Sequence, residues 1–377
     1  MVILNLKLNN IYLFNNFNVN FSYPKKLTNS LIENEFVQEQ PSFRYKKLNI
    51  FIGANATGKT SLIKAIWFTL YFLTKRERET ILRMVNPNKD NAYIEIDLVD
   101  SLSLYRIKIK VKKIELENGN IDNEITVAHV KLELKDRDSY ENRLADLDNA
   151  IYVFNDYREA LDEININSGW RTALPATESA FDGITFLKVS KELEDEYTNT
   201  LYNVLNTLDP SITNVFKSSD SNDAYVIVHE NSKNIILQEG TKLSTISLLS
   251  SGTKYGISIA NMMYSIKHHL NGIYLIDEQF SYVNADVEAA ILSTMVSNLG
   301  PNEQIFFTTH NTKLLNMSFP THSLYFMKKD IVDGKSNITI DCASYYENRN
   351  NVSVKNMFEN DAFGTTPKLD KIYSMGR

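Results

Sequence analysis

The chain has 377 residues, 43% hydrophobic and 23% charged, so it can bury the core of one large domain with an insertion, or of two domains. Its net charge of −6 argues against a protein held to nucleic acid by overall positive charge. No apolar run approaches the roughly 18 residues of a membrane span, and the single cysteine, Cys342, excludes an intrachain disulfide and a cysteine-based metal site.

The first residues, MVILNLKLNN, show neither a charged leader nor a signal-type apolar segment, so we expect no export signal. A chain with one cysteine suits a reducing compartment. We therefore expect a cytoplasmic protein.

The N-terminal part of the chain predicts strands and one helix. Residues 2–23 alternate apolar and polar side chains and predict two strands, and residues 24–45 predict a loop-rich excursion. The apolar run at 48–52 predicts a buried parallel strand, and residues 59–74 predict a helix with a continuous apolar face.

The middle of the chain changes character. Three alternating runs within residues 92–135 predict an antiparallel meander, and the charged residues 136–148 predict a surface helix or loop. Apolar residues at three- and four-residue steps predict a helix within 187–208. The later part predicts an α/β domain with a largely parallel sheet. Its expected elements are strands at 224–228 and 234–238, a helix at 254–269, a strand at 273–276, a helix at 285–299 and a strand at 305–307.

Residues 53–60, GANATGKT, match the phosphate-loop pattern G-x-x-x-x-G-K-[ST]. The glycines let the backbone curl so that N–H groups point at phosphate oxygens, and the following helix N-terminus also favours anions. Lys59 can bridge the β- and γ-phosphates, and the Thr60 hydroxyl can ligate Mg²⁺. The alternative is a glycine-rich turn without a ligand. The apolar strand before the motif and the apolar helix after it favour the phosphate loop.

The apolar run GIYLIDE at 272–278 ends in two carboxylates. At the end of a buried strand, Asp277 would lie beside the phosphate loop and hold Mg²⁺ directly or through water. Glu278 would accept a hydrogen bond from the attacking water. A solvated acidic pair after a core strand is the alternative, and the presence of the phosphate loop favours the functional interpretation.

Two further segments complete the predicted site. His310 follows the strand at 305–307 and could sense the γ-phosphate and orient Glu278; a structural histidine satisfied by a loop is the alternative. Ser250, Ser251 and Gly252 open the helix predicted at 254–269, where hydroxyl and N–H groups can bind an anion. When this cluster is taken alone, plain helix capping is the better explanation of it.

In chain order the four motifs are the phosphate loop, the serine-glycine segment, the Asp277-Glu278 pair and His310. Their types and order resemble those of the ABC-type ATPases, particularly the SMC, RecF and OLD branch. The sequence departs from that pattern at Ala56 and Ser251, where the family has glycine, and in the weak D-loop segment QFSYVNAD. The family's Q-loop has no glutamine match after the phosphate loop, since Gln38 and Gln40 precede it, and the NDYR segment at 155–158 is the candidate. The resemblance implies an α/β fold: an ABC-type P-loop ATPase head with a mixed sheet, an antiparallel β lobe and an α+β insertion.

The resemblance also implies a symmetric dimer in which the signature of one copy covers ATP held by the other. The expected catalytic residues are Glu278, His310 and Lys59, and the expected Mg²⁺ ligands are Thr60 and Asp277. The expected nucleotide-binding residues are Gly53, Asn55, Ala56, Thr57, Gly58, Lys59, Thr60 and Ser61 of one copy with Ser250, Ser251 and Gly252 of the other.

At finer grain, the TTHNTKLLN string and the C-terminal FENDAFGTTP resemble the AbiL and PARIS AriA ATPases of bacterial antiphage defence. This implies a phage-derived trigger and a protein effector, a nuclease or toxin, encoded nearby. We expect ATPase lobes at 1–85 and 216–377 and a recognition insertion at 86–215.

A DNA-clamping repair ATPase is the alternative, with Lys108, Lys110 and Lys112 as DNA contacts. A solvated strand face explains that lysine stripe more simply. An OLD-type nuclease should carry a metal-binding Toprim domain, for which we find no sequence signature. A transporter engine is disfavoured because nothing suggests a membrane partner.

Overall fold

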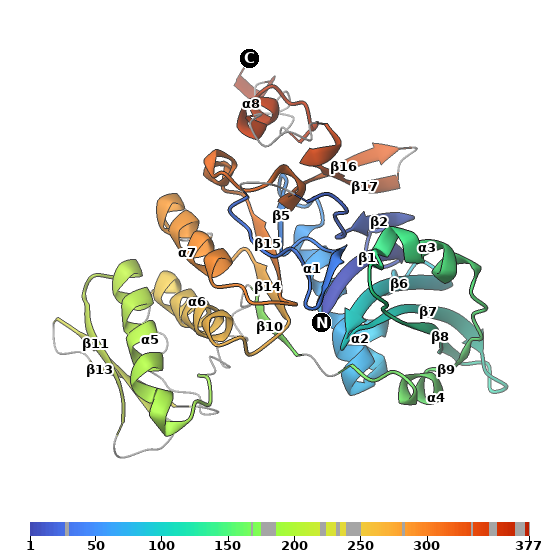
Figure 1. Ribbon diagram of the computed structural model, residues 1–377, viewed down its shortest axis with the longest axis horizontal. Coiled ribbons are helices and arrows are strands. Elements are labelled where there is room, and N and C mark those ends of the chain that lie inside the picture. Colours follow the sequence, from blue (N-terminus) through green and yellow to red (C-terminus); the bar gives the residue numbers. More distant parts are fainter. Residues whose placement is uncertain are drawn as a thin grey trace.

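The computed structural model (Figure 1) describes most of the chain. The described residues are 1–26, 30–166, 169–174, 186–218, 224–230, 234–238, 250–280, 283–332, 335–346, 353–365 and 374–376. No helix in these residues is long and apolar enough to cross a membrane.

An antiparallel sheet forms one lobe of the molecule. Its strands are β1 (Val2–Asn9), β2 (Phe17–Asn20), β6 (Asn91–Asp100), β7 (Ser103–Glu115), β8 (Ile121–Glu133) and β9 (Asn155–Asp156), in the order β2-β1-β6-β7-β8-β9. The meander predicted for residues 92–135 is therefore present as β6–β8. The two strands predicted at the N-terminus extend this same sheet, because β1 pairs with β6 over most of its length.

A second, mixed sheet forms the centre of the molecule. Its strands are β5 (Leu48–Ile52), β10 (Trp170–Ala173), β14 (Ile273–Asp277), β15 (Gln304–Thr309), β16 (Leu324–Val332) and β17 (Lys335–Cys342), in the order β10-β14-β15-β5-β16-β17. The first five strands in this order run parallel and only β17 is antiparallel. The C-terminal ends of β5, β14 and β15 therefore lie at one edge of the sheet.

Helices cover both faces of the mixed sheet because successive strand side chains point to opposite sides. On one face, Phe51 and Phe306 share a core with Leu62 of α1 (Lys59–Lys75). On the other face, Ile50 and Phe307 share a core with residues of α6 (Ser251–Lys267), α7 (Ala285–Ser297) and α5 (Glu194–Leu208). The helix after the phosphate-loop sequence and the helix after the serine-glycine sequence thus pack on opposite faces (Figure 1).

A small antiparallel sheet packs beside α5. Its strands are β11 (Ile212–Lys217), β12 (Ala224–His229) and β13 (Asn234–Gln238). The helical stripe predicted within 187–208 is confirmed, since Tyr197, Leu201 and Leu205 of α5 are buried in the core.

Several elements were not expected from the sequence. The predicted loop-rich excursion contains a short hairpin, and the mixed sheet also contains β10, β16 and β17, for which no residue ranges are predicted above. The remaining elements are β3 (Phe36–Val37), β4 (Gln40–Arg44), α2 (Arg78–Leu82), α3 (Tyr140–Asn149), α4 (Tyr157–Asp162), α8 (Val354–Glu359) and short 3-10 helices at Lys191–Leu193, Thr312–Asn316, Thr321–Ser323, Ala343–Tyr345 and Ser374–Gly376.

Candidate active site

Three strand ends bring the predicted catalytic segments together. Asp277 at the end of β14 pairs with Thr308 of β15, and Thr309 pairs with Ile52 at the end of β5. The loop that follows Ile52, the carboxylates that follow β14 and the histidine that follows β15 therefore emerge at the same sheet edge. In parallel α/β sheets this edge is where ligands bind.

The backbone of the phosphate loop adopts a left-handed conformation at two positions. Gly58, the N-cap of α1, has φ 99° and Ala56 has φ 62°. A Cβ atom on Gly53 would lie 2.5 Å from the carbonyl oxygen of Met327, so β16 leaves no room for a side chain there. Backbone N–H groups of residues 54–59 make no hydrogen bond within the described part of the chain. These N–H groups are therefore available to donate hydrogen bonds to an anion.

The remaining loop residues have distinct positions. Asn55 and Ala56 are exposed at the tip of the loop, whereas the Thr57 hydroxyl is buried and donates to the Ala54 carbonyl at 2.9 Å. Ser61 is half-buried in the first turn of α1.

Lys59 is buried beneath the loop and is only 3% exposed. Its Nζ donates to the carbonyl oxygens of Gly53 at 2.9 Å and Ala54 at 3.1 Å, and lies 3.7 Å from Oε1 of Glu278. Burial lowers the pKa of Lys59, an effect opposed by Glu278 and Asp277. The ammonium group thus lies between the loop and the carboxylates, where it can contact a terminal phosphate.

Asp277 is a buried carboxylate with an unsatisfied oxygen. Its Oδ1 accepts a hydrogen bond from Thr308 at 2.5 Å, while Oδ2 has no hydrogen-bond partner among the described residues. Burial raises the pKa of Asp277, and the hydrogen bond from Thr308 and the nearby hydroxyl of Thr60 oppose this rise. Thr60 and Asp277 are hard oxygen donors that fit Mg²⁺. No cluster of three metal-binding side chains occurs in the described residues, so phosphate and water would have to complete the coordination of such an ion.

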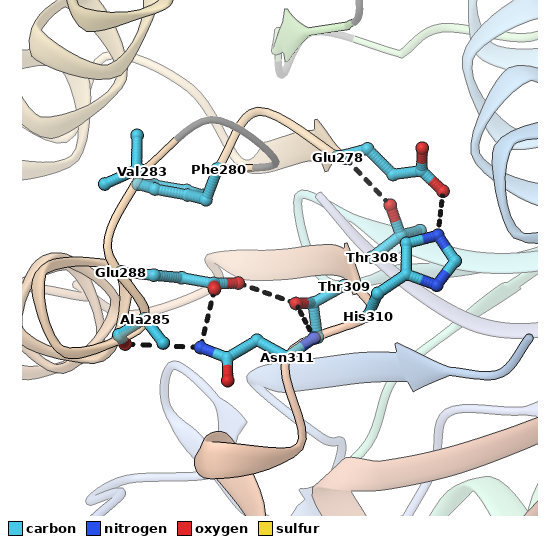
Figure 2. A pocket seen from close by; sticks show the side chains of 9 residues that line it. All are labelled: Glu278, Phe280, Val283, Ala285, Glu288, Thr308, Thr309, His310 and Asn311. Carbon is cyan, nitrogen blue, oxygen red and sulfur yellow. Dashed lines mark hydrogen bonds and ion pairs between the residues drawn. The ribbon is translucent and has the colours of Figure 1, made fainter. Parts of the chain in front are cut away.

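Glu278 and His310 form a hydrogen-bonded pair (Figure 2), and Lys59 lies next to Glu278. Oε1 of Glu278 lies 2.8 Å from Nε2 of His310. This hydrogen bond is the main cause that lowers the pKa of Glu278, although partial burial works against it. The backbone of Glu278 is left-handed, with φ 45°, and its N–H donates to the Thr308 hydroxyl at 3.0 Å. Backbone strain of this kind is concentrated at functional sites.

A polar network that the sequence reasoning missed lies next to this pair. Glu288 of α7 is buried and accepts hydrogen bonds from Thr309 and Asn311, the neighbours of His310 (Figure 2). The same residues line a cavity of about 280 Å³ that also borders Glu278 and Phe280. In the sequence Glu288 has no signal beyond an acidic residue in a helical first turn, which is common.

The serine-glycine segment lies apart from the phosphate loop. Ser250 is the N-cap of α6, where its Oγ accepts from the Thr253 N–H at 3.1 Å. This confirms that the serine caps the helix. Gly252 is half-buried, and a Cβ atom there would meet only the Ser250 Oγ, at 3.8 Å. Ser251 begins α6, while Leu249 is outside the described residues. Since α6 and α1 cover opposite faces of the sheet, the fold does not bring this segment to Lys59 of the same chain.

Two weaker expectations can also be located. Asn155 and Asp156 of the NDYR segment pair with β8 at the edge of the antiparallel sheet, away from the ends of β5 and β14. In the QFSYVNAD segment, Ser281 and Tyr282 lie outside the described residues.

The lysine stripe on β7 contacts aromatic rings of the same chain. Nζ of Lys108 lies 3.4 Å from the ring centre of Tyr152, and Nζ of Lys110 lies 3.6 Å from that of Phe154. Lys112 is exposed. Two of the three lysines therefore already make cation–π interactions.

Comparisons with known proteins identify the family and the fold. The family model described as "AAA domain, putative AbiEii toxin, Type IV TA system" matches residues 48–316. Among solved structures, an SMC head bound to the C-winged helix domain of ScpA has a TM-score of 0.52 at 14% identity, covering 92% of this chain and 99% of that chain. An SMC head with an extended coiled coil, bound to the C-terminal domain of ScpA derived from Pyrococcus furiosus, has a TM-score of 0.51 at 12% identity, covering 91% and 97%. No curated protein sequence matches. These likenesses confirm the predicted fold of an ABC-type P-loop ATPase head.

Proposed function

Because the chain belongs to the family of AAA domains described as putative AbiEii toxin of a type IV toxin–antitoxin system, we propose that it binds and hydrolyses ATP and thereby controls a partner effector. The observation that carries the ATPase proposal is the convergence of Lys59, Glu278 and His310 at one sheet edge, with Glu278 hydrogen-bonded to His310 and 3.7 Å from the lysine.

The proposed chemistry follows from the positions of these side chains. The loop N–H groups and Lys59 bind the phosphates, and Thr60 and Asp277 hold Mg²⁺, which supplies positive charge for the phosphate oxygens. Glu278 orients the attacking water and accepts its hydrogen bond, because its lowered pKa keeps it ionised at neutral pH. His310 holds the Glu278 carboxylate and lies where it can contact the terminal phosphate.

We further propose that the site is completed by a second copy of the chain. Ser250, Ser251 and Gly252 lie at the start of α6, on the face of the sheet opposite α1. A two-fold dimer would place this helix N-terminus over the nucleotide of its partner and form two equal sites. Nucleotide that binds the closed dimer more tightly than the open one would then act as a switch.

For the cellular role we propose antiphage defence by abortive infection. Residues 86–215 would recognise a phage-derived trigger or the effector, a nuclease or toxin encoded nearby, and the nucleotide state would hold or release that effector. The description of the matching family, which names a putative toxin of a type IV toxin–antitoxin system, supports this role. The SMC heads of similar fold were solved with a bound partner protein, which supports protein partners for such heads.

Two variants define the experiment. Glu278→Gln should retain ATP and trap the closed dimer while losing hydrolysis, whereas Lys59→Ala should remain empty. Each variant is coexpressed with its genomic neighbours and purified with and without ATP, and the complexes are weighed by native mass spectrometry. A neighbour that binds one nucleotide state and not the other supports the regulator. If the Glu278→Gln variant hydrolyses ATP at the wild-type rate, the assignment of Glu278 as the catalytic residue is refuted.

A DNA-clamping repair ATPase is the second candidate, favoured by the fold shared with SMC heads. Lys108 and Lys110 already contact aromatic rings of the same chain. Lys112 is exposed and makes no cation–π contact within the described residues, so it is the lysine of this stripe most available to DNA. Affinity for duplex DNA that falls steeply with salt, and that weakens in Lys112→Gln, would favour this candidate over the effector regulator.

A further inference from the structure

Glu288 is a buried acid next to the proposed catalytic pair. It lies in the first turn of α7 and is 3% exposed. Its Oε1 accepts a hydrogen bond from the Thr309 hydroxyl at 2.7 Å, and its Oε2 accepts one from Nδ2 of Asn311, also at 2.7 Å (Figure 2). Burial raises the pKa of Glu288, and these two hydrogen bonds oppose the rise. Both carboxylate oxygens of Glu288 therefore accept a hydrogen bond, and the donors, Thr309 and Asn311, are the residues on either side of His310.

The turn that carries His310 is fixed to α7 at more than these two atoms. Nδ2 of Asn311 also donates to the Ala285 carbonyl at 3.2 Å, and the Asn311 backbone N–H donates to the Thr309 hydroxyl at 2.9 Å. Three consecutive residues, with His310 in the middle, are thus held against the start of one helix. His310 itself points away from α7 and toward Glu278 (Figure 2).

The same helix is joined through the chain to Glu278. Residues 279–283 connect Glu278 to Asn284, the N-cap of α7. On the other side, the hydrogen bonds that Glu288 accepts hold the His310 turn, and His310 is hydrogen-bonded to Glu278. A displacement of the start of α7 would therefore move the His310 turn and alter its hydrogen bond to Glu278.

We propose that Glu288 is a positioning residue, which holds the His310 turn against α7 and so fixes the hydrogen bond between His310 and Glu278. This inference rests on the proposed ATPase function, in which that hydrogen bond orients the catalytic carboxylate. Glu288 itself touches neither nucleotide nor water in the reaction. It acts through the residues that flank His310.

The hydrogen-bond directions allow a reversal test. Glu288→Gln places an amide NH₂ group against the NH₂ group of Asn311, and Asn311→Asp places two carboxylates together. The double variant Glu288→Gln/Asn311→Asp restores a donor and an acceptor in the reverse order. Each single variant should lower kcat by roughly 10- to 100-fold and change the Kd for ATP by less than about threefold. The double variant should be more active than Asn311→Asp alone but recover only part of the lost kcat, because the hydrogen bond from Asn311 to the Ala285 carbonyl is not restored.

Two further variants keep the test decisive if the single changes unfold the chain. Thr309→Val removes one donor at nearly constant volume and should lower kcat, whereas Thr309→Ser keeps the hydroxyl and should not. Asp286→Asn is the matched control, because Asp286 lies in the same helical turn but pairs with Lys313 on the surface at 3.0 Å. This control should hydrolyse ATP like the wild type.

A measurement that does not depend on ATP hydrolysis distinguishes a failure of this inference from a failure of the proposed ATPase function. At a fixed pH, the imidazole ¹⁵N resonances of His310, assigned with His310→Gln, should shift in Glu288→Gln and return in the double variant. If the wild type fails to hydrolyse ATP, these resonances still decide the role of Glu288. Unchanged His310 resonances in Glu288→Gln, or a double variant no more active than Asn311→Asp alone, would overturn the inference.

Discussion

Nε2 of His310 lies 2.8 Å from Oε1 of Glu278, although the two residues are 32 positions apart in the sequence. They meet because β14 and β15 are parallel neighbours whose ends lie at one sheet edge. This contact links the residue proposed to orient water with the residue proposed to contact the terminal phosphate.

The first prediction concerns the pH dependence of hydrolysis. The pKa of Glu278 is lowered chiefly by the hydrogen bond from His310, so its reactive carboxylate form persists below the ordinary titration range of glutamate. His310→Ala removes that hydrogen bond and should raise the pKa of Glu278 toward its ordinary value. We expect kcat to fall by roughly 100-fold and the acid limb of the kcat profile to move to higher pH. An acid limb at the wild-type position would show that His310 does not control this carboxylate.

The second prediction concerns nucleotide affinity. Lys59 is buried and its charge is compensated by the loop carbonyls and Glu278, so it is preorganised to receive phosphate. Loss of charge-assisted hydrogen bonds worth about 1.5–3 kcal/mol should weaken ATP binding by at least 10-fold in Lys59→Ala. Isothermal titration with Mg·ATP measures this change. Lys75→Ala, at the exposed C-terminal end of the same helix, is the control and should bind ATP like the wild type.

The third prediction concerns the backbone of the phosphate loop. Gly53→Ala should destabilise the fold by about 1–3 kcal/mol, because the new Cβ would lie 2.5 Å from the Met327 carbonyl oxygen. Ala56→Gly should stabilise the loop by up to about 1 kcal/mol, since Ala56 holds a left-handed conformation that glycine adopts without strain. Urea unfolding of the two variants should therefore shift in opposite directions. A shift of Gly53→Ala toward higher stability would contradict the observed packing against β16.

The fourth prediction separates stability from assembly at the proposed signature. Within its own chain Gly252 has room for a methyl group, because the nearest atom would be 3.8 Å away. Gly252→Ala should therefore leave the melting temperature unchanged or slightly raised. If a partner's nucleotide packs against this residue, the same variant should lose hydrolysis and retain ATP binding by the monomer. Full hydrolysis by Gly252→Ala would argue against such a close approach.

Much of the central sheet could be predicted from the sequence. The Leu48–Ile52 run and the run ending at Asp277 are fully buried strands, and such strands are continuously apolar and easy to recognise. Their motifs then place the phosphate loop and the carboxylates at one edge, because strands in such a fold are parallel.

The strands at the sides of that sheet could not be predicted in the same way. β10 has the sequence WRTA, in which only Ala173 is buried, so it lacks an apolar run. Strand β16 begins with an apolar run but continues into Lys328 and Lys329, which breaks the pattern of a buried parallel strand. Both strands are held by pairing with a core neighbour, a long-range effect that local patterns do not contain.

Glu288 is the residue of the site that could not be predicted from the sequence. An acidic residue in the first turn of a helix is expected from the helix dipole and is usually exposed. Only the packing of α7 against the turn after β15 buries this carboxylate and gives it two donors. The structure is therefore needed to recognise the proposed positioning role of Glu288.

The most direct test of the composite site is hydrolysis by mixed variants. Lys59→Ala removes phosphate binding, and Ser250→Arg blocks the proposed cover, so each variant alone should be inactive. When the two variants are mixed in equal amounts, half of the dimers should be heterodimers, and each heterodimer has one intact site and one defective site. About a quarter of all sites are then intact, so the mixture should regain about a quarter of wild-type hydrolysis. A mixture as inactive as its components, with dimers present, would contradict a site shared between two chains, as would wild-type activity of Ser250→Arg alone.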